Sequence, residues 1–187
     1  MQPYPVTFSV DYPDRELHRV TSAFRIFTAI PIVVILGTIG SAVFLGLVLM
    51  LLFRKKYPRW WYDWNLELSR LTNRASTYLL LMDDRYPSTD DQQSVHLEWP
   101  EVTGEELSRG LPLVKWFLAI PHYIVLAFLG IAVVFVAIYA WFAILFTGRY
   151  PRGAFEFVEG VLRWANRVSG YMYDLVTDAY PPFSLSP

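Results

Sequence analysis

The 187-residue chain has no cysteine and few charged residues. The absence of cysteine excludes disulfides, thiolate nucleophiles, thiolate zinc sites and iron–sulfur clusters. Charged residues make up 18% of the chain, against about a quarter in a typical soluble domain. The chain has 16 Lys plus Arg and 17 Asp plus Glu, so it has no excess of basic residues to bind the phosphates of a nucleic acid. We therefore expect no nucleic-acid partner.

Hydrophobic residues are abundant instead, at 54% of the chain, and they are concentrated in two long runs. The runs from Ile26 to Phe53 and from Trp116 to Phe146 contain no Asp, Glu, Lys or Arg. At about 1.5 Å per helical residue, either run could cross roughly 30 Å of hydrocarbon. We predict two membrane segments, about 26–53 and 116–146. Neither is expected to be a cleaved signal peptide, because both exceed the roughly 7–15 residues of a signal core.

The two halves of the sequence match each other in order and spacing. The matched blocks are Val10–Pro13 with Leu97–Pro100, Arg25 with Lys115, Ala29–Pro31 with Ala119–Pro121, Tyr57–Arg59 with Tyr150–Arg152, and Asp84–Pro87 with Asp178–Pro181. A repeated Arg-x-x-Asn-Arg-x-x-x-Tyr pattern is a further match. The sequence therefore predicts two tandem units, 1–87 and 94–187, joined by a polar linker at 88–93.

Each unit contains the same predicted elements. Alternating residues at Val6–Val10 and Val95–Trp99 predict short strands, which should pair with each other or with a partner protein. After each Tyr-Pro-Arg, apolar residues spaced three and four apart predict an amphipathic helix. Such helices could lie along a membrane surface or pack together as an antiparallel pair. The predicted fold is mainly α and integral to the membrane: two tandem repeats, each with a short strand, a membrane-inserted helical segment and an amphipathic interfacial helix.

The topology of the apolar runs has two alternatives. Basic residues flank both ends of both runs, so we favour hairpins that enter and leave on one side over single spans. Gly37, Gly40 and Gly130 lie near the expected turns. The predicted interfacial anchors are Arg54, Lys55, Lys56, Trp60, Trp61, Trp64, Trp116, Arg149, Arg152 and Trp164.

The repeated Arg-x-x-Asn-Arg-x-x-x-Tyr pattern is the main candidate site. Its members are Arg70, Asn73, Arg74 and Tyr78 in the first unit and Arg163, Asn166, Arg167 and Tyr171 in the second. Two arginines one helical turn apart could bind the phosphate oxygens of an anionic lipid headgroup. They could also pair with Glu67 or Glu159 and stabilise the fold, which is the interpretation we favour.

Motifs for catalysis are missing from the sequence. It has no glycine-rich phosphate loop, no paired metal ligands at helical spacing and no Gly-x-Ser-x-Gly turn. We interpret Asp83, Asp84, Asp90 and Asp91 as an acidic surface linker. His122 is the one histidine at membrane depth, and it is a minor candidate for a haem or chlorophyll axial ligand. We expect no enzymatic activity, no metal and no cofactor.

The second unit resembles a known membrane family. The resemblance is carried by Leu111–Trp116, Ala119–Gly130, Trp141–Gly153, Val161–Trp164 and Tyr180–Phe183, which are similar to a bacterial family catalogued as domain of unknown function 4389. The first unit is less similar, because Phe53–Trp60 replaces the Phe146–Gly153 block. The resemblance implies a bacterial membrane location but no activity. We expect the inner (plasma) membrane, a multi-pass or re-entrant topology and cytoplasmic soluble parts.

The expected function is a non-catalytic accessory or scaffolding subunit of a larger membrane complex, for example a photosynthetic or electron-transport complex. Its expected partners are membrane lipids and other membrane-protein subunits. The alternative is a lipid-headgroup-binding or small-solute transport component. Few polar residues, among them Thr38, Ser41, His122 and tyrosines, interrupt the apolar runs, which argues against a polar permeation path.

Overall fold

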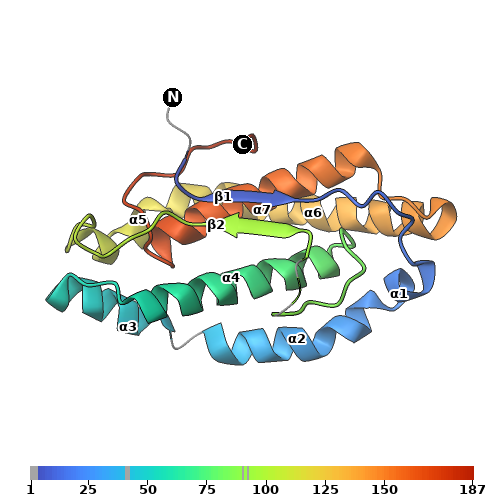
Figure 1. The fold of residues 1–187 in the computed structure, drawn as a ribbon. Helices are drawn as coiled ribbons and strands as arrows, with labels where there is room; N and C mark the ends of the chain where they lie inside the picture. Colours follow the sequence, from blue (N-terminus) through green and yellow to red (C-terminus); the bar gives the residue numbers. More distant parts are fainter. Residues whose placement is uncertain (1–3, 41–42, 90, 92) are drawn as a thin grey trace.

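The computed structural model describes residues 4–40, 43–89, 91 and 93–187, and the chain is mainly helical, as predicted. The first half contains β1 (Thr7–Val10), α1 (Arg19–Ala23), α2 (Arg25–Gly40), α3 (Val43–Leu49), the π-helical turn η1 (Met50–Arg54) and α4 (Arg59–Leu79) (Figure 1). The second half contains β2 (Val95–Glu98), the 3-10 turn η2 (Leu111–Leu113), α5 (Lys115–Leu118), α6 (Ile120–Thr147) and α7 (Arg152–Met172).

The two strands form one antiparallel ribbon in which Phe8 faces Leu97. This confirms the prediction that the strands pair with each other. Along each strand, buried and exposed side chains alternate. One face of the ribbon therefore packs on the helices, while the other face carries Ser9, His96 and Glu98 at the surface.

Each strand packs on the amphipathic helix of the other half of the chain. β1 lies against α7, and β2 lies against α4 (Figure 1). The main core contains Phe8 and Leu97 from the ribbon together with Met82, Val158 and Leu175 from the two halves. Because the strands are exchanged in this way, neither half buries its own strand alone.

From Ile120 on, the second apolar run is one continuous helix, so the hairpin expected there is wrong. Gly130 lies in the middle of α6, whose 28 residues extend for about 42 Å. Pro121 stands in the first turn, where its missing N–H costs nothing, and no later proline interrupts the helix. Among the described residues, α6 is the one helix long and apolar enough to cross a membrane.

The first apolar run is divided into α2, α3 and η1. Pro31 lies inside α2, although the same Ala-Ile-Pro sequence begins α6 in the second half. Gly37 is also inside α2, and Gly40 is its last residue. Positions 41 and 42, between α2 and α3, lie outside the described residues. In Figure 1, α3 extends beyond the end of α2 and does not fold back along it.

Two residues after each apolar run, the backbone enters the left-handed region. Gly148 has φ 75°, and Lys55 has φ 50° at the equivalent place in the first half. The Gly148 N–H donates to the carbonyl of Ile144 at 2.8 Å, and the Lys55 N–H donates to that of Leu51 at 3.1 Å. The left-handed turn lets the chain reverse toward α4 or α7, and it is less favourable for Lys55 because of its Cβ.

Candidate functional site

A buried arginine joins the start of α2 to the end of α4. The side chain of Arg25 is 1% exposed, and its Nη2 lies 2.5 Å from Asp84 Oδ1. Its Nη1 donates to the carbonyls of Tyr78 and Asp83, and its guanidinium lies 4.5 Å from the centre of the Tyr78 ring. The backbone N–H of His18 donates to the other Asp84 oxygen at 2.7 Å. Asp84 therefore fixes two segments of the first half.

The second half contains the same arrangement around a lysine. Lys115 Nζ lies 2.7 Å from Asp178 Oδ1, donates to the carbonyl of Thr177 at 2.7 Å and lies 4.9 Å from the centre of the Tyr171 ring. The backbone N–H of Ser108 donates to the other Asp178 oxygen at 2.7 Å. Burial raises the pKa of the Asp178 carboxyl, but the bonds from Lys115 and Ser108 together lower it by more. The pKa therefore lies below its usual value.

The prediction of an acidic surface linker is wrong for Asp83 and Asp84. Both carboxyls are largely buried, and Ser94 Oγ donates to Asp83 at 2.7 Å. The Asp83 carboxylate pairs with Arg15 and with the neighbouring Arg85. Arg25, the cationic partner of Asp84, lies almost sixty residues away, so local polarity could not reveal that pairing. Asp91 is exposed, as expected, and Asp90 lies outside the described residues.

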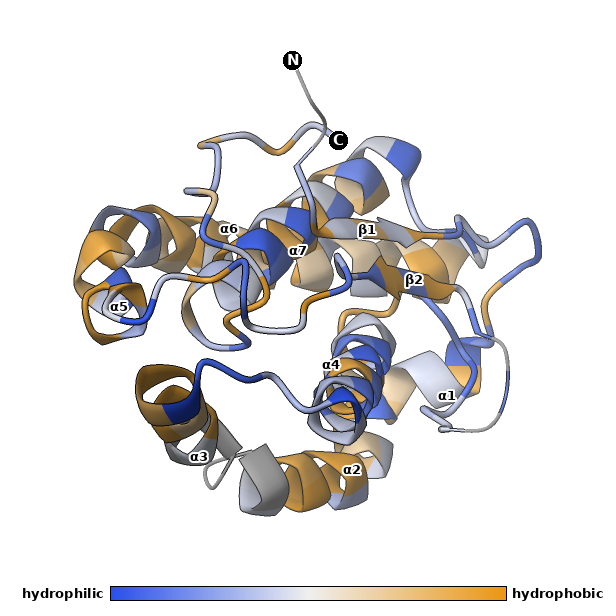
Figure 2. Ribbon diagram, turned by 60° about the vertical axis from the view of Figure 1, so that its left-hand side comes forward, coloured by the Kyte–Doolittle hydropathy of each residue, from blue (hydrophilic) through white to orange (hydrophobic). Residues whose placement is uncertain are grey.

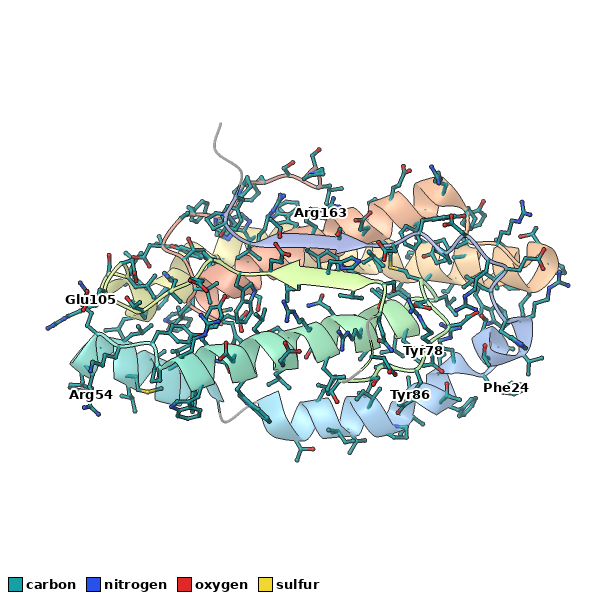
Figure 3. All side chains as sticks on the ribbon, viewed as in Figure 1. Phe24, Arg54, Tyr78, Tyr86, Glu105 and Arg163 are labelled. Atoms are coloured by element: carbon teal, nitrogen blue, oxygen red, sulfur yellow. The ribbon has the colours of Figure 1, made fainter. Side chains whose placement is uncertain are left out.

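The first arginine of each repeated pattern binds the central ribbon. Arg70 Nε donates to the carbonyl of Leu97 at 3.1 Å, and Arg163 Nε donates to that of Phe8 at 2.9 Å. Figure 3 labels Arg163 near β1. Since Phe8 and Leu97 face each other in the sheet, the two arginines hold opposite points of one ribbon. Each also pairs with a glutamate of its own helix at 2.6 Å: Glu67 for Arg70, and Glu159 for Arg163.

The asparagines of the two patterns bind each other. Asn73 Nδ2 donates to Asn166 Oδ1 at 2.7 Å, and Asn166 Nδ2 donates to Asn73 Oδ1 at 2.7 Å. Both side chains are buried, so this reciprocal pair satisfies amide groups that water cannot reach. The pair joins α4 to α7 at the middle of the molecule.

The second arginine of each pattern also contacts backbone within the fold. Arg74 Nη1 donates to the carbonyl of Ser88, and Arg167 Nη1 donates to that of Ser184 at 3.4 Å. Arg163 and Arg167 are both buried. All four arginines thus bind main-chain oxygens of the protein, an arrangement that favours the stabilising interpretation over headgroup binding.

The predicted interfacial anchors differ in their exposure. Arg54, Lys56, Trp60, Trp64, Trp116, Arg149 and Arg152 are exposed, and Lys55 and Trp61 are half-buried. Trp164 is instead buried, so its assignment as a surface anchor is wrong. α7 is covered by β1 and α6, which leaves little of this helix at any surface.

His122 has a defined structural partner. Its side chain is fully buried, and Trp164 Nε1 donates to its Nδ1 at 3.0 Å. Since Nδ1 accepts this bond, the neutral ring carries its proton on Nε2 and offers no lone pair there for an axial bond. The ring also stacks on Phe183 with 4.0 Å between centres. Within the described ranges, no three His, Asp or Glu side chains form a cluster that could hold a metal ion.

A cavity of about 380 Å³ lies between α4 and α7, with Leu36 of α2 on its wall, and the asparagines of the predicted site, Asn73 and Asn166, also line it. Its polar lining includes Asn65, Ser69, Thr72, Ser76, Ser169 and Asp174. The spacing of the α4 hydroxyls is a signal that the sequence does contain, because positions three and four apart share a helical face. Asp174 lies after the end of α7, so the spacing of the α4 hydroxyls does not reveal that it also lines the cavity.

Asp174 is the only carboxyl group in the described lining of the cavity. Ser169 Oγ donates to Asp174 Oδ2 at 2.9 Å, and no ion pair to this carboxyl is formed by the described residues. Burial raises the pKa of Asp174 to about 7, although hydrogen bonds from Ser169 and Ser69 lower it. Strongly perturbed pKa values are frequent at functional sites, although structural burial alone also produces them.

The fold and these contacts define a mainly helical protein built around a two-stranded ribbon, with one helix able to cross a membrane by length and composition. Residues 112–184 match the model of a family described as Domain of unknown function (DUF4389). The match supports the resemblance seen in the second half of the sequence, and it finds one copy, not two. No curated protein and no solved structure matches the chain.

Proposed function

We propose that this chain is a non-catalytic accessory protein of a bacterial inner membrane, built from two tandem copies of one unit. The main support for the proposal is that α6 is packed against the protein on one side and exposes large apolar side chains on the other. The contacts that support two copies are the pairs Arg25–Asp84 and Lys115–Asp178, together with the reciprocal asparagine bonds. These contacts recur at positions that also match in the sequence.

Helix α6 is packed on one side and exposed on the other. The buried side chains His122, Val133, Ala140 and Ile144 follow one side of the helix from its first turn to its last. The opposite side exposes large apolar residues: Phe128, Ile131, Phe135, Phe142 and Phe146. An apolar surface of this length is unfavourable in water and is suited to acyl chains. In Figure 2, α2 and α3 lie at the lower edge and α6 lies at the upper left beside α7, and all three are coloured mainly as hydrophobic.

We further propose that α6 lies along the membrane and does not cross it. α7 packs beside α6, and the middle of α7 carries the ribbon through Arg163. The outer face of the ribbon exposes His96 and Glu98. If α6 crossed the bilayer, these groups would lie near mid-depth, where a charged side chain costs roughly 3 kcal/mol or more. In the orientation along the membrane, they remain in water.

This orientation places both ends of α6 on one side of the membrane, and it can be tested directly because the chain has no native cysteine. Single variants Arg109→Cys and Thr147→Cys, at exposed positions near the two ends of α6, are treated with a membrane-impermeant maleimide in sealed vesicles. We expect labelling of both from the same side. Phe135→Cys, in the proposed lipid-facing surface, should react only after detergent is added. Labelling of the two end variants from opposite sides would contradict the proposal.

The accessory role follows from the aromatic side chains on the same surface. Phe128, Phe135 and Tyr139 are exposed on α6 and could pack against helices of a larger assembly. A photocrosslinker at position 139, in the native membrane, should join the chain to a specific membrane protein, and one at exposed Ser9 should not. Equal crosslinking from both positions, or crosslinking to lipid alone, would contradict a scaffolding role. The alternative of headgroup binding is favoured by a separate observation, the cavity at Asp174.

A further inference from the structure

The cavity between α4 and α7 has one ionisable acid and no base in its described lining. Its polar groups are hydroxyls and amides, together with the Asp174 carboxyl and the Tyr173 phenol. No Lys, Arg or His side chain contributes to this lining. Such a site disfavours phosphate and other anions, because it offers them no positive charge. It favours a ligand that brings its own positive charge.

The Asp174 carboxyl has hydrogen-bond donors but no counter-charge among the described residues. The carboxyl is buried and receives a bond from the neutral hydroxyl of Ser169, but no described cation pairs with it. Elsewhere in this chain, the partly buried acids Asp84 and Asp178 each have a cation within 2.7 Å. A buried carboxylate without a counter-charge is costly, so an external cation would stabilise its ionised form.

We propose that this cavity binds a primary ammonium group, carried by a lipid headgroup or by a small free amine, with Asp174 as its counter-charge. The volume of about 380 Å³ lies at the lower end of small-molecule sites, which are roughly 300–1,000 Å³. Both sources present the same chemistry to the site. The proposal does not depend on whether α6 lies along the membrane or crosses it.

The hydroxyls in the cavity favour a primary over a quaternary ammonium. Thr72 Oγ1 donates to the carbonyl of Leu68 at 2.8 Å, and Ser76 Oγ donates to that of Thr72 at 2.9 Å. Their hydrogens are used within α4, so they can offer only lone pairs to a ligand. A primary ammonium has three N–H donors to meet such acceptors. A quaternary ammonium has none and is bound by aromatic cages, whereas Tyr173 is the sole aromatic side chain in the described lining.

The test is a titration of the purified full-length chain, in a nonionic detergent at pH 8, with ethanolamine and with choline as the quaternary counterpart. We expect ethanolamine to bind and choline to bind roughly tenfold or more weakly, because its N–H donors are missing. Asp174→Asn keeps the shape of the side chain and removes its charge, and it should weaken ethanolamine binding by roughly tenfold or more. Asp91→Asn, at an exposed position, should leave binding unchanged and is the matched control.

A second variant and a lipid experiment complete the test. Ser76→Ala should weaken ethanolamine binding by roughly twofold to tenfold, since it removes one neutral hydrogen bond. Native mass spectrometry from nanodiscs containing phosphatidylethanolamine and phosphatidylcholine then distinguishes the two sources. Retention of phosphatidylethanolamine by the wild type, but not by Asp174→Asn, assigns the ammonium to a lipid, and binding of ethanolamine alone assigns it to a free amine.

The proposal would be overturned by any of three results. These are no binding of either ethanolamine or phosphatidylethanolamine by a folded wild type, equal binding by wild type and Asp174→Asn, and equal binding of ethanolamine and choline. None of these results bears on the labelling of Arg109→Cys and Thr147→Cys, so failure of this proposal is distinguishable from failure of the membrane placement.

Discussion

Replacing Asp174 with Asn should stabilise the protein at alkaline pH. The carboxyl is buried beside α4 and α7 and has no cationic partner among the described residues, so its ionisation disfavours the folded state. Asn has nearly the same shape, carries no charge and can still accept a hydrogen bond from Ser169 through its amide oxygen. The substitution therefore removes an ionisation penalty with little change in packing.

The magnitude follows from the pKa of this group. Folding raises the pKa of Asp174 from 3.8 to about 7, so the folded state holds the proton more tightly than the unfolded state. Below about pH 4 both states are protonated and there is no penalty. Stability then falls as the pH rises from about 4 to about 7, and it stays lower above that range. Three pKa units at 1.36 kcal/mol each give a total loss of about 4 kcal/mol, as an upper bound.

The assay is chemical unfolding of wild type and Asp174→Asn in the same detergent, without added amine, at pH values from 4 to 8. We expect the difference in unfolding free energy to grow from near zero at pH 4 to about 2–4 kcal/mol in favour of the variant at pH 8. Asp91→Asn, at the surface, should show no such trend. If Asp174→Asn is no more stable than wild type at pH 8, or if its advantage is the same at pH 4, the carboxyl is not ionised inside the fold as argued.

Three further predictions concern contacts within the second half and between the two halves. Asp178→Ala leaves buried Lys115 unpaired and should destabilise the protein by about 3–5 kcal/mol, measured by unfolding at pH 7; a loss below about 1 kcal/mol would show that the pair is solvated. Asn166→Ala removes both bonds between the asparagines and leaves the buried Oδ1 of Asn73 without this donor, although Asn73 Nδ2 keeps its bond to the Ser69 carbonyl; it should cost about 1–3 kcal/mol in the same assay. Asn73→Ala combined with Asn166→Ala should cost less than the two single losses added, and simple additivity would argue against their reciprocal bonding. After cleavage at a protease site introduced into the linker at 88–93, the two fragments should elute together from gel filtration in detergent, because each strand packs on the helix of the other half. Separation of the fragments without denaturant would contradict this exchange of strands between the halves.

Several elements of the fold could be predicted because their signals are local. The strands and the amphipathic helices follow from alternating or three-and-four spacing within a short stretch of chain. The pairing of the strands followed from their unpaired edges, although the exact register, with Phe8 opposite Leu97, needed the structure. The sequence also matched Arg25 with Lys115, and the structure shows that these two residues make equivalent contacts.

Other features could not be predicted because they depend on partners distant in the chain. Asp84 is a polar residue in a polar stretch, and only its approach to Arg25 shows that it is buried. Trp164 fits a membrane-interface pattern, but the packing of α6 and β1 on α7 places it in the interior. The hairpin preference for the second run relied on flanking charges, whereas the continuous hydrogen bonding of α6 decided its shape.

The sequence by itself determined the apolar runs, the strands and the amphipathic helices, since hydrophobic spacing and helix-breaking residues act over a few positions. Tertiary structure decided which strand each amphipathic helix covers, where the buried cations find their carboxylates and that Asp174 reaches the cavity between α4 and α7. The physical reason is that burial and ion pairing depend on the distance between groups in space, and the closed fold alone sets that distance for residues far apart in the chain.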